Sequence, residues 1–266
     1  MVPSKSKLGS TKPRIAIPEP CSYDKAYSDR SIKSYLEAVE AAGGEPVVIP
    51  LGLTPEETAK RITGCCAVLL PGSKADVDPQ KFGAERHPQT AAPDPLRDAA
   101  DELLIQDAYN LRKPIFGICY GLQSLNVWRT GSLVQHIESR INHAVGGGAM
   151  AHQVQVDGQT LLAREIGTNT TPGAISVNSS HHQSADVVGD GLRVSARSSE
   201  DGIIEALEGT QPGHYVLAVQ WHPERTFASD PPSLRLFQAL IEAAGQWRER
   251  AQVTNSPEQK RAGGQT

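Results

Sequence analysis

A cysteine flanked by two glycines is the first candidate for chemistry in this sequence. Cys119 follows the apolar run at 115–118, which is too short for a helix and is typical of a buried strand in a parallel sheet. Apolar residues then recur with helical spacing over 122–127. Gly117 and Gly121 lie two residues to each side of Cys119, the spacing of a nucleophile elbow, where a sharp turn between strand and helix exposes the reactive side chain. The spacing therefore predicts a nucleophilic thiol at the top of a sheet.

Two interpretations of Cys119 are open at this point. At the start of a helix, free N–H groups carry a partial positive charge that favours the thiolate over the thiol and makes the sulfur a nucleophile. A free cysteine is also a small apolar residue, and many such cysteines are inert parts of a core. The residues around Cys119 do not decide between the two, whereas a catalytic partner elsewhere in the chain would.

A histidine and a carboxylate further along the chain supply such a partner. His222 and Glu224 follow the apolar run at 216–219, and Pro223 is expected to hold His222 in an extended conformation. Side chains alternate along an extended chain, so His222 and Glu224 would lie on one side of it. Together with Cys119 they have the residue types of a triad in which the histidine takes the thiol proton and the carboxylate orients the imidazole.

Three segments, GICYGLQSLN, VNSSHHQ and AVQWHPE, occur in the order and spacing of the class I glutamine amidotransferase-like superfamily. With further matches from about Arg14 to about Ala244, the sequence resembles the stand-alone γ-glutamyl hydrolases of that superfamily, of the γ-glutamyl-γ-aminobutyrate hydrolase type. The resemblance implies a cysteine peptidase-like enzyme that hydrolyses γ-glutamyl-γ-aminobutyrate or a related γ-glutamyl amine through a thioester, without a cofactor. It does not identify the amine half of the substrate.

The resemblance also implies the position of an oxyanion hole. Backbone N–H groups of Gly72 or Ser73, and of Tyr120, would stabilise the negative charge that develops on the carbonyl oxygen during attack. An ordinary turn explains the composition around Gly72 and Ser73 equally well.

Substrate contacts are implied for three polar side chains. Gln123 matches a position that contacts the glutamyl group in the resembled family, although it could equally be a polar residue on a helix face. Either His181 or His182 would touch the ligand, and a hydrogen-bonded structural histidine is an equal alternative. The sequence does not choose between the two rings.

Two rival functions use the same residues. The first is a glutaminase subunit that supplies ammonia to a separate synthetase, which we rank second because the sequence contains no synthetase segment. The second is a non-catalytic binding or regulatory protein, and the intact set of Cys119, His222 and Glu224 argues against it.

The elements that must position these residues alternate between strand and helix in the first half of the chain. Strands are predicted at 15–17, 47–49 and around Val68, and helices at 31–42, after a capping box at Thr54, and from Asp94 to about Asn110. Short strand-like runs dominate after Leu133, and the GGG at 146–148 is predicted to be a loop near the mouth of the site. The fold class is therefore α/β, with a mainly parallel central sheet flanked by helices and a strand-rich second half; the resemblance implies a flavodoxin-like arrangement.

The predicted organisation is a single domain over 13–248, with disordered segments at 1–12 and 249–266 that have too little apolar content to fold. The net charge of -4 and the interleaved charge signs predict neither a nucleic acid nor a membrane as partner. The partner expected is a small γ-glutamyl substrate, and a homodimer is left open.

The cysteines and acidic residues outside the triad predict no further chemistry. The four cysteines lack disulfide-scaffold spacing, and the first 12 residues lack the apolar core of a signal peptide, so a cytoplasmic location is expected. Cys65 and Cys66 begin an apolar run and are predicted to be buried. Asp76 and Asp78 lack the glycine and glutamate of a calcium loop, and no metal site is predicted.

Overall fold

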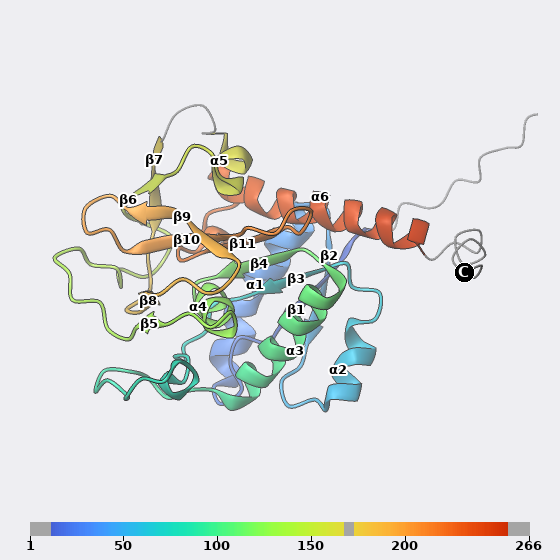
Figure 1. The fold of residues 1–266 in the computed structure, drawn as a ribbon, viewed down its shortest axis with the longest axis horizontal. Coiled ribbons are helices and arrows are strands. Elements are labelled where there is room, and N and C mark those ends of the chain that lie inside the picture. The colour runs from blue at the N-terminus through green and yellow to red at the C-terminus, as the bar shows by residue number, and fades with distance from the viewer. Residues whose placement is uncertain (1–11, 168–172, 255–266) are drawn as a thin grey trace, which may run out of the picture.

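A computed structural model describes residues 12–167 and 173–254, and its central element is a nine-stranded sheet (Figure 1). The sheet order is β2-β1-β3-β4-β11-β10-β9-β6-β7. The strands from β2 to β11 run parallel, and each strand beyond β11 is antiparallel to its neighbour. In chain order these strands are β1 (Arg14–Pro18), β2 (Glu45–Ile49), β3 (Ala67–Leu70), β4 (Ile115–Ile118), β6 (Met150–Val156), β7 (Gly173–Asn178), β9 (Leu192–Ser198), β10 (Ile204–Gly209) and β11 (Val216–Val219).

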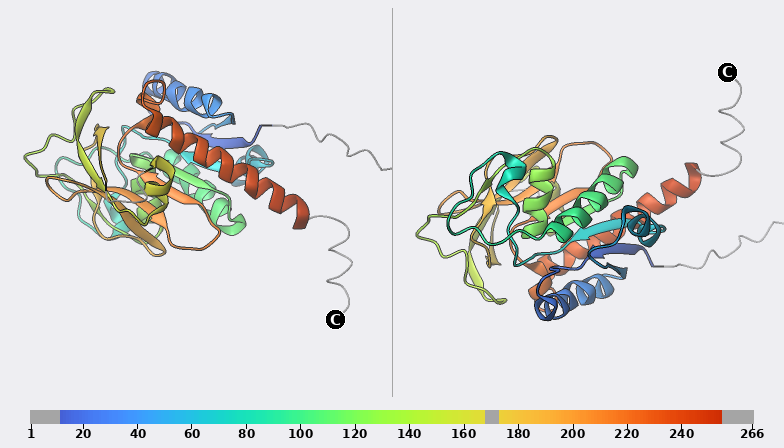
Figure 2. Two further views of the ribbon diagram at one scale, coloured as in Figure 1. Left: turned by 90° about the horizontal axis from the view of Figure 1, so that it is seen from above. Right: turned by 90° about the horizontal axis from the view of Figure 1, so that it is seen from below.

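Helices cover both faces of the parallel half of the sheet, as the two views of Figure 2 show. Helices α1 and α6 pack on one face, and α2, α3 and α4 pack on the other. The short strands β5 (Leu133–Val134) and β8 (Ser184–Ala185) form a separate pair. The helices are α1 (Lys25–Ala41), α2 (Pro55–Ile62), α3 (Pro95–Leu111), α4 (Tyr120–Trp128), α5 (Leu161–Ile166) and α6 (Pro231–Thr254).

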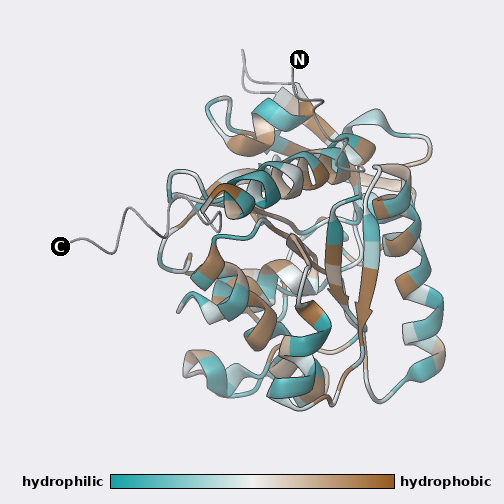
Figure 3. Ribbon diagram, turned by 90° about the vertical axis from the view of Figure 1, so that its right-hand side faces the viewer, coloured by the Kyte–Doolittle hydropathy of each residue, from teal (hydrophilic) through white to brown (hydrophobic). Residues whose placement is uncertain are grey.

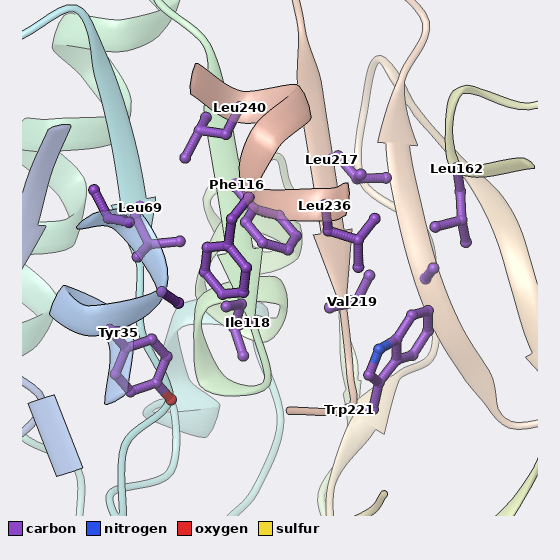
Figure 4. Packing of buried hydrophobic residues seen from close by; sticks show 14 of the residues in the cluster. Tyr35, Leu69, Phe116, Ile118, Leu162, Leu217, Val219, Trp221, Leu236 and Leu240 are labelled. Carbon is purple, nitrogen blue, oxygen red and sulfur yellow. The ribbon is translucent and has the colours of Figure 1, made fainter. Parts of the chain in front are cut away.

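Strand β4 shows how the two hydrophobic layers are built. Phe116 and Ile118 point to the α1 and α6 side, where Phe116 meets Phe237 edge to face at 5.5 Å (Figure 4). Ile115 belongs to the opposite layer, with Leu104 of α3. Because side chains alternate along a strand, a fully buried strand of this kind is apolar at every position that carries a side chain. The prediction of a buried parallel strand at 115–118 is confirmed.

Local signals place several helix starts where the sequence predicts them. The Thr54 hydroxyl accepts a hydrogen bond from the Glu57 N–H at 3.2 Å, and the Glu57 carboxylate accepts one from the Thr54 N–H at 2.9 Å. This reciprocal pair is the capping box expected from the sequence. Asp94 caps α3 in a similar way by accepting from the Arg97 N–H.

The helices differ from the predictions at three places. Helix α1 begins at Lys25 rather than at Ser31, because Asp24 caps it by accepting from the Tyr27 N–H. Helices α5 and α6 were not predicted, and α6 continues to Thr254, so residues 249–254 are helical and not part of a disordered tail. The remaining segments predicted to be disordered, 1–11 and 255–266, lie outside the described residues.

Helix α6 is long because its apolar residues return once per turn and pack on α1 and the sheet. Hydrophobic and hydrophilic residues alternate along the helices of Figure 3, as expected for helices with one face on a sheet. Among the described residues, no helix is both long enough and apolar enough to cross a membrane.

Candidate active site

Cys119 occupies the sharp turn between β4 and α4, with φ of 54° and ψ of -105°. This conformation is unfavourable for a residue with a side chain, and such strain is held in place only where the surrounding structure enforces it. A Cβ on Gly117 would lie 2.9 Å from the Gly121 backbone, and a Cβ on Gly121 would overlap the Leu70 carbonyl oxygen. The two glycines therefore let the helix approach the sheet closely enough to form the elbow predicted from the sequence.

His222 reaches the same edge of the sheet because β11 is the parallel neighbour of β4. The pairing of Val219 with Ile118 brings the residues that follow both strands to the carboxyl ends of adjacent strands. The Cys119 N–H also donates to the Val219 carbonyl at 2.8 Å. The topology thus joins two residues that are far apart in the sequence.

Glu224 contacts His222 through a different backbone shape from the one predicted. Residues Pro223–Arg225 form a 3-10 turn rather than an extended segment, so side-chain alternation is not the cause of the contact. In this turn, His222 Nδ1 lies 2.7 Å from Glu224 Oε1, and both side chains are almost fully buried. The turn brings the carboxylate back onto the ring, and the pair forms as expected by another route.

The edge of the buried His222 ring that points away from Glu224 faces Gly72 and Cys119. A Cβ placed on Gly72 would lie 3.1 Å from His222 Cε1 and 3.7 Å from Cys119 Cβ. His222 Nε2 has no hydrogen-bond partner among the described residues. Burial alone would lower the pKa of His222, but the negative charges of Glu224 and Cys119, together with the close side-chain contacts with Cys119 and Glu224, raise it to about 9. The arrangement can therefore hold a proton on the ring next to the sulfur at neutral pH.

Asn178, at the end of β7, is a contributor that the sequence analysis missed. Its Nδ2 donates to the His222 carbonyl and its Oδ1 accepts from the His222 N–H, each at 2.8 Å. The residue lies in the VNSSHHQ segment, but the sequence does not reveal that this segment reaches the backbone of His222.

The segment predicted to supply an oxyanion hole lies beside the thiol, with a difference at Gly72. The Gly72 N–H donates to the Tyr35 hydroxyl at 3.0 Å, and nothing among the described residues accepts from the Ser73 N–H. Tyr120 is the first residue of α4, so its N–H has no partner within the helix. The N–H groups of Ser73 and Tyr120 therefore lack the contact that occupies the Gly72 N–H, and the oxyanion role of all three residues stays a prediction.

A buried arginine fixes the loop before Gly72. Arg97 of α3 donates to the Pro71 carbonyl at 2.7 Å and to Asp101 at 2.7 Å, and its side chain is fully buried. The guanidinium also lies over the Tyr120 ring, 4.9 Å from its centroid. One cation therefore contacts both segments that carry the candidate oxyanion donors.

The predicted substrate residues separate into two groups. The Gln123 amide nitrogen donates to the Gln183 carbonyl and to Gln220 Oε1, each at 3.2 Å, so a role in substrate binding stays a prediction. His181 is buried against Glu205, with Nδ1 2.9 Å from the Gln183 carbonyl, which matches the structural alternative. His182 is partly exposed and pairs with Asp76, and both rings line one pocket, so a ligand contact by either ring stays a prediction.

The GGG loop at 146–148 contacts the 3-10 turn that carries Glu224. Arg225 Nη1 donates to the Gly147 carbonyl at 3.2 Å, and Arg225 Nε lies 3.4 Å from Glu224. This location agrees with the prediction of a loop near the mouth of the site.

For metal binding, the described residues offer one group with suitable spacing, formed by His143, His181 and Glu205.

Solved structures with low sequence identity share this fold. A candidate GMP synthase subunit from Thermoplasma acidophilum aligns with a TM-score of 0.60 and 15% identity, covering 92% of this chain and 100% of that one. The glutaminase domain of CTPS from Trypanosoma brucei aligns with a TM-score of 0.57 and 18% identity, covering 88% and 94%. The chain thus has the fold of the class I glutamine amidotransferases.

Sequence comparison narrows this class to a family. Residues 17–224 match peptidase C26, and the chain belongs to that family. It is 40% identical to a Mycobacterium tuberculosis protein named as a candidate glutamine amidotransferase, over 79% of this chain and 66% of that protein, and so spans slightly less than two thirds of it. It is 35% identical to the γ-glutamyl-γ-aminobutyrate hydrolase PuuD of Escherichia coli, over 79% of this chain and 85% of that protein.

Proposed function

We propose that this protein hydrolyses γ-glutamyl amide bonds through a thioester on Cys119, with His222 as acid and base and Glu224 as its orienting group. The observation that carries the proposal is the contact between His222 Nδ1 and Glu224, which leaves Nε2 of a buried ring unpartnered on the side that faces Gly72 and Cys119. Membership of the peptidase C26 family supports hydrolysis of such bonds. The similarity to γ-glutamyl-γ-aminobutyrate hydrolases supports a γ-glutamyl amine as substrate.

In the first half of the reaction, the Cys119 sulfur attacks the γ-carbonyl carbon and the carbonyl oxygen becomes an anion. We assign the stabilisation of that anion to the N–H groups of Tyr120 and Ser73, because fixed donors act without reorganising. The C–N bond then breaks, and the amine leaves with the proton from His222 Nε2. The γ-glutamyl group remains on the sulfur as a thioester.

In the second half, His222 has lost its proton and can accept one from water. The resulting hydroxide attacks the thioester carbon, the C–S bond breaks, and glutamate leaves. Glu224 stabilises the charged ring and fixes Nδ1 as the protonated nitrogen, so that Nε2 faces the reacting atoms in both steps.

The direct test is trapping of the nucleophile. Intact-protein mass spectrometry after treatment with an electrophilic glutamine analogue should show one adduct, located on Cys119. The Cys66→Ala variant should give the same adduct, because the Cys66 thiol contacts the Gly64 carbonyl and not His222, whereas Cys119→Ala should give none and should have no turnover. An adduct on Cys65 or Cys66 with Cys119 unmodified would refute the assignment.

A second measurement separates a stand-alone hydrolase from a glutaminase that serves a synthetase. Glutamate release from γ-glutamyl-γ-aminobutyrate and from glutamine should be compared at matched concentrations with the purified chain alone. We expect the larger substrate to react faster, because contacts to its amine half can contribute binding energy at the transition state that ammonia cannot. Faster reaction with glutamine, or activity that needs an added synthetase, would favour the glutaminase.

A further inference from the structure

A buried carboxylate surrounded by three imidazoles lies on β10, in the antiparallel half of the sheet. Strand β10 is the neighbour of β11, which leads to His222 (Figure 1). Glu205 of β10 is fully buried, and its Oε1 lies 2.9 Å from His152 Nε2, 3.4 Å from His143 Nδ1 and 3.6 Å from His181 Nε2. The three rings come from β6, from the segment between β5 and β6, and from the turn after β7. Each is more than nine-tenths buried.

Two of the rings have their proton positions fixed by other contacts. His143 Nε2 lies 2.9 Å from Asp201 Oδ2, and His181 Nδ1 lies 2.9 Å from the Gln183 carbonyl. A carboxylate and a carbonyl only accept hydrogen bonds, so the proton of each neutral ring is on the nitrogen that faces them. His143 Nδ1 and His181 Nε2 must then present lone pairs, and neither atom has a hydrogen-bond partner among the described residues.

Both lone pairs face the Glu205 carboxylate, which itself offers only lone pairs when ionised. Its second oxygen is also buried without a partner among the residues that the structure describes. Three electron-rich atoms that converge in a buried space repel one another unless a cation lies between them. The ligand atoms of His143, His181 and Glu205 all lie within 4.8 Å of one another.

We propose that His143 Nδ1, His181 Nε2 and the Glu205 carboxylate bind a zinc ion. A tetrahedral zinc with bonds of about 2.1 Å has ligand atoms about 3.4 Å apart. The two distances from Glu205 Oε1, 3.4 Å and 3.6 Å, match that spacing. Two imidazoles and one carboxylate suit zinc and leave a fourth position for water. The sequence predicts no metal because these ligands come from three separated segments without a metal-binding motif.

The surrounding contacts are those that orient metal ligands. Histidine ligands of metals usually donate their second N–H to a carboxylate or a backbone carbonyl, as His143 does to Asp201 and His181 does to Gln183. His152 Nε2 is placed to donate to Glu205 in the same way. These outer contacts fix the ring tautomers and the carboxylate before any ion arrives.

A polar pocket of about 280 Å³ gives an ion access to this cluster. The ion would tie the segment before β6 to the turn after β7 and to β10. The Glu205 carbonyl accepts from the Gln220 N–H at 2.8 Å, two residues before His222 in the sequence, so the cluster also supports the strand that leads to the catalytic histidine. The pocket is lined by residues of the segment 136–144, which includes His143, and by His181 and His182.

The competing explanation is protonation in place of metal. Burial lowers the pKa of His143, but its close contacts with the carboxylates of Glu205 and Asp201 outweigh this and raise the pKa above the ordinary value. Imidazolium rings would then satisfy Glu205 without an ion. A cluster filled by protons takes up no metal and does not respond to a chelator, so the two explanations differ in measurable ways.

The test uses the full chain, stripped with a chelator and titrated with Co²⁺ and then with Zn²⁺. We expect one Co²⁺ per chain with the visible absorption of tetrahedral coordination, displaced by one Zn²⁺. His181→Gln should weaken Zn²⁺ binding by about 100-fold or more, and His152→Gln by about 10- to 100-fold, because the latter removes only an outer contact. The control His87→Gln removes an imidazole outside the cluster and should bind as the wild type does.

Thermal unfolding gives a readout that is independent of activity. Zinc should raise the Tm of the wild type and of His87→Gln, and at the same zinc concentration it should raise the Tm of His181→Gln much less. Lack of metal uptake by the stripped wild type overturns the proposal without reference to any variant. Equal uptake by the wild type and by His181→Gln also overturns it, because the ion would then bind elsewhere.

Discussion

The side-chain amide of Asn178 hydrogen-bonds to both backbone groups of His222, at 2.8 Å to each. An amide presents a donor and an acceptor side by side, so one side chain can satisfy the N–H and the carbonyl of a single residue. These two hydrogen bonds hold the backbone of His222, while Glu224 holds its imidazole ring. The position of His222 is therefore determined by one contact within its own segment, with Glu224, and by one contact from a distant segment, with Asn178.

We expect Asn178→Ala to lower kcat/KM on the order of 100-fold, because a displacement of the base by about 1 Å has an effect of that size. The loss should appear mainly in kcat if Asn178 positions the base and does not touch substrate. The matched control is Asn110→Ala, at an exposed position near the end of α3, which should have wild-type kinetics. A change in KM alone would contradict the positioning role.

The pH profile of kcat/KM should depend on Glu224. The pKa of His222, about 9, means that the ring keeps its proton through neutral pH and loses it as the pH rises through that value, so activity should fall on the alkaline side near pH 9. Glu224→Gln removes the negative charge that contributes most to raising this pKa, so the alkaline fall should move to lower pH.

The same Glu224→Gln variant should retain more activity than His222→Ala, because the base is still present. The comparison requires kcat/KM for both variants on one γ-glutamyl substrate between pH 5 and pH 10, roughly the range in which histidine titrates here. An unchanged alkaline limb, together with wild-type activity at neutral pH, would remove Glu224 from the mechanism.

The strained backbone of Cys119 gives a stability prediction that is separate from activity. Glycine adopts a φ of 54° without a Cβ clash, so Cys119→Gly should be more stable than Cys119→Ala by about 1 kcal/mol. At an ordinary helical position the order reverses, and Ala59→Gly on the exposed face of α2 should cost about 1 kcal/mol. Chemical denaturation of the four proteins, wild type included, measures both effects. If Cys119→Ala is the more stable of the two variants, the turn stores no strain.

Close packing at Gly121 should make this position intolerant of any side chain. A Cβ there would overlap the Leu70 carbonyl oxygen and lie 2.9 Å from its carbonyl carbon. Because backbone cannot move aside cheaply, we expect Gly121→Ala to lower the free energy of unfolding by about 3 kcal/mol or more.

The control for Gly121 is a second helical glycine in open space. A Cβ on Gly245 of α6 would contact nothing within 4 Å, so Gly245→Ala should raise stability by about 0.5–1 kcal/mol through helix propensity alone. Urea unfolding of both variants gives the comparison. A mild effect at Gly121 would show that α4 can shift away from β3, and the elbow would then be less rigid than the structure indicates.

The features that the sequence alone determined are those set by residues close to one another in the chain. The spacing of the glycines around Cys119 indicates the elbow, although the Leu70 backbone that requires glycine at 121 comes from a distant strand. Thr54 and Glu57 specify a helix start because they are close in the chain, and the apolar runs at 115–118 and 216–219 are strands because only a buried strand is apolar at consecutive positions over so short a length.

The features that only the tertiary structure decided are contacts between segments whose approach no local pattern encodes. Three hydrogen bonds are examples: Asn178 with the His222 backbone, Arg97 with the Pro71 carbonyl, and the Gly72 N–H with the Tyr35 hydroxyl. Each forms because the sheet order brings distant segments together. Glu224 contacts His222 through a 3-10 turn and not through an extended chain. The sequence therefore predicted the right pair of residues but the wrong backbone conformation between them. His181 is buried against Glu205, whereas His182 is partly exposed and pairs with Asp76, because β10 lies beside one ring and the loop after β3 lies beside the other.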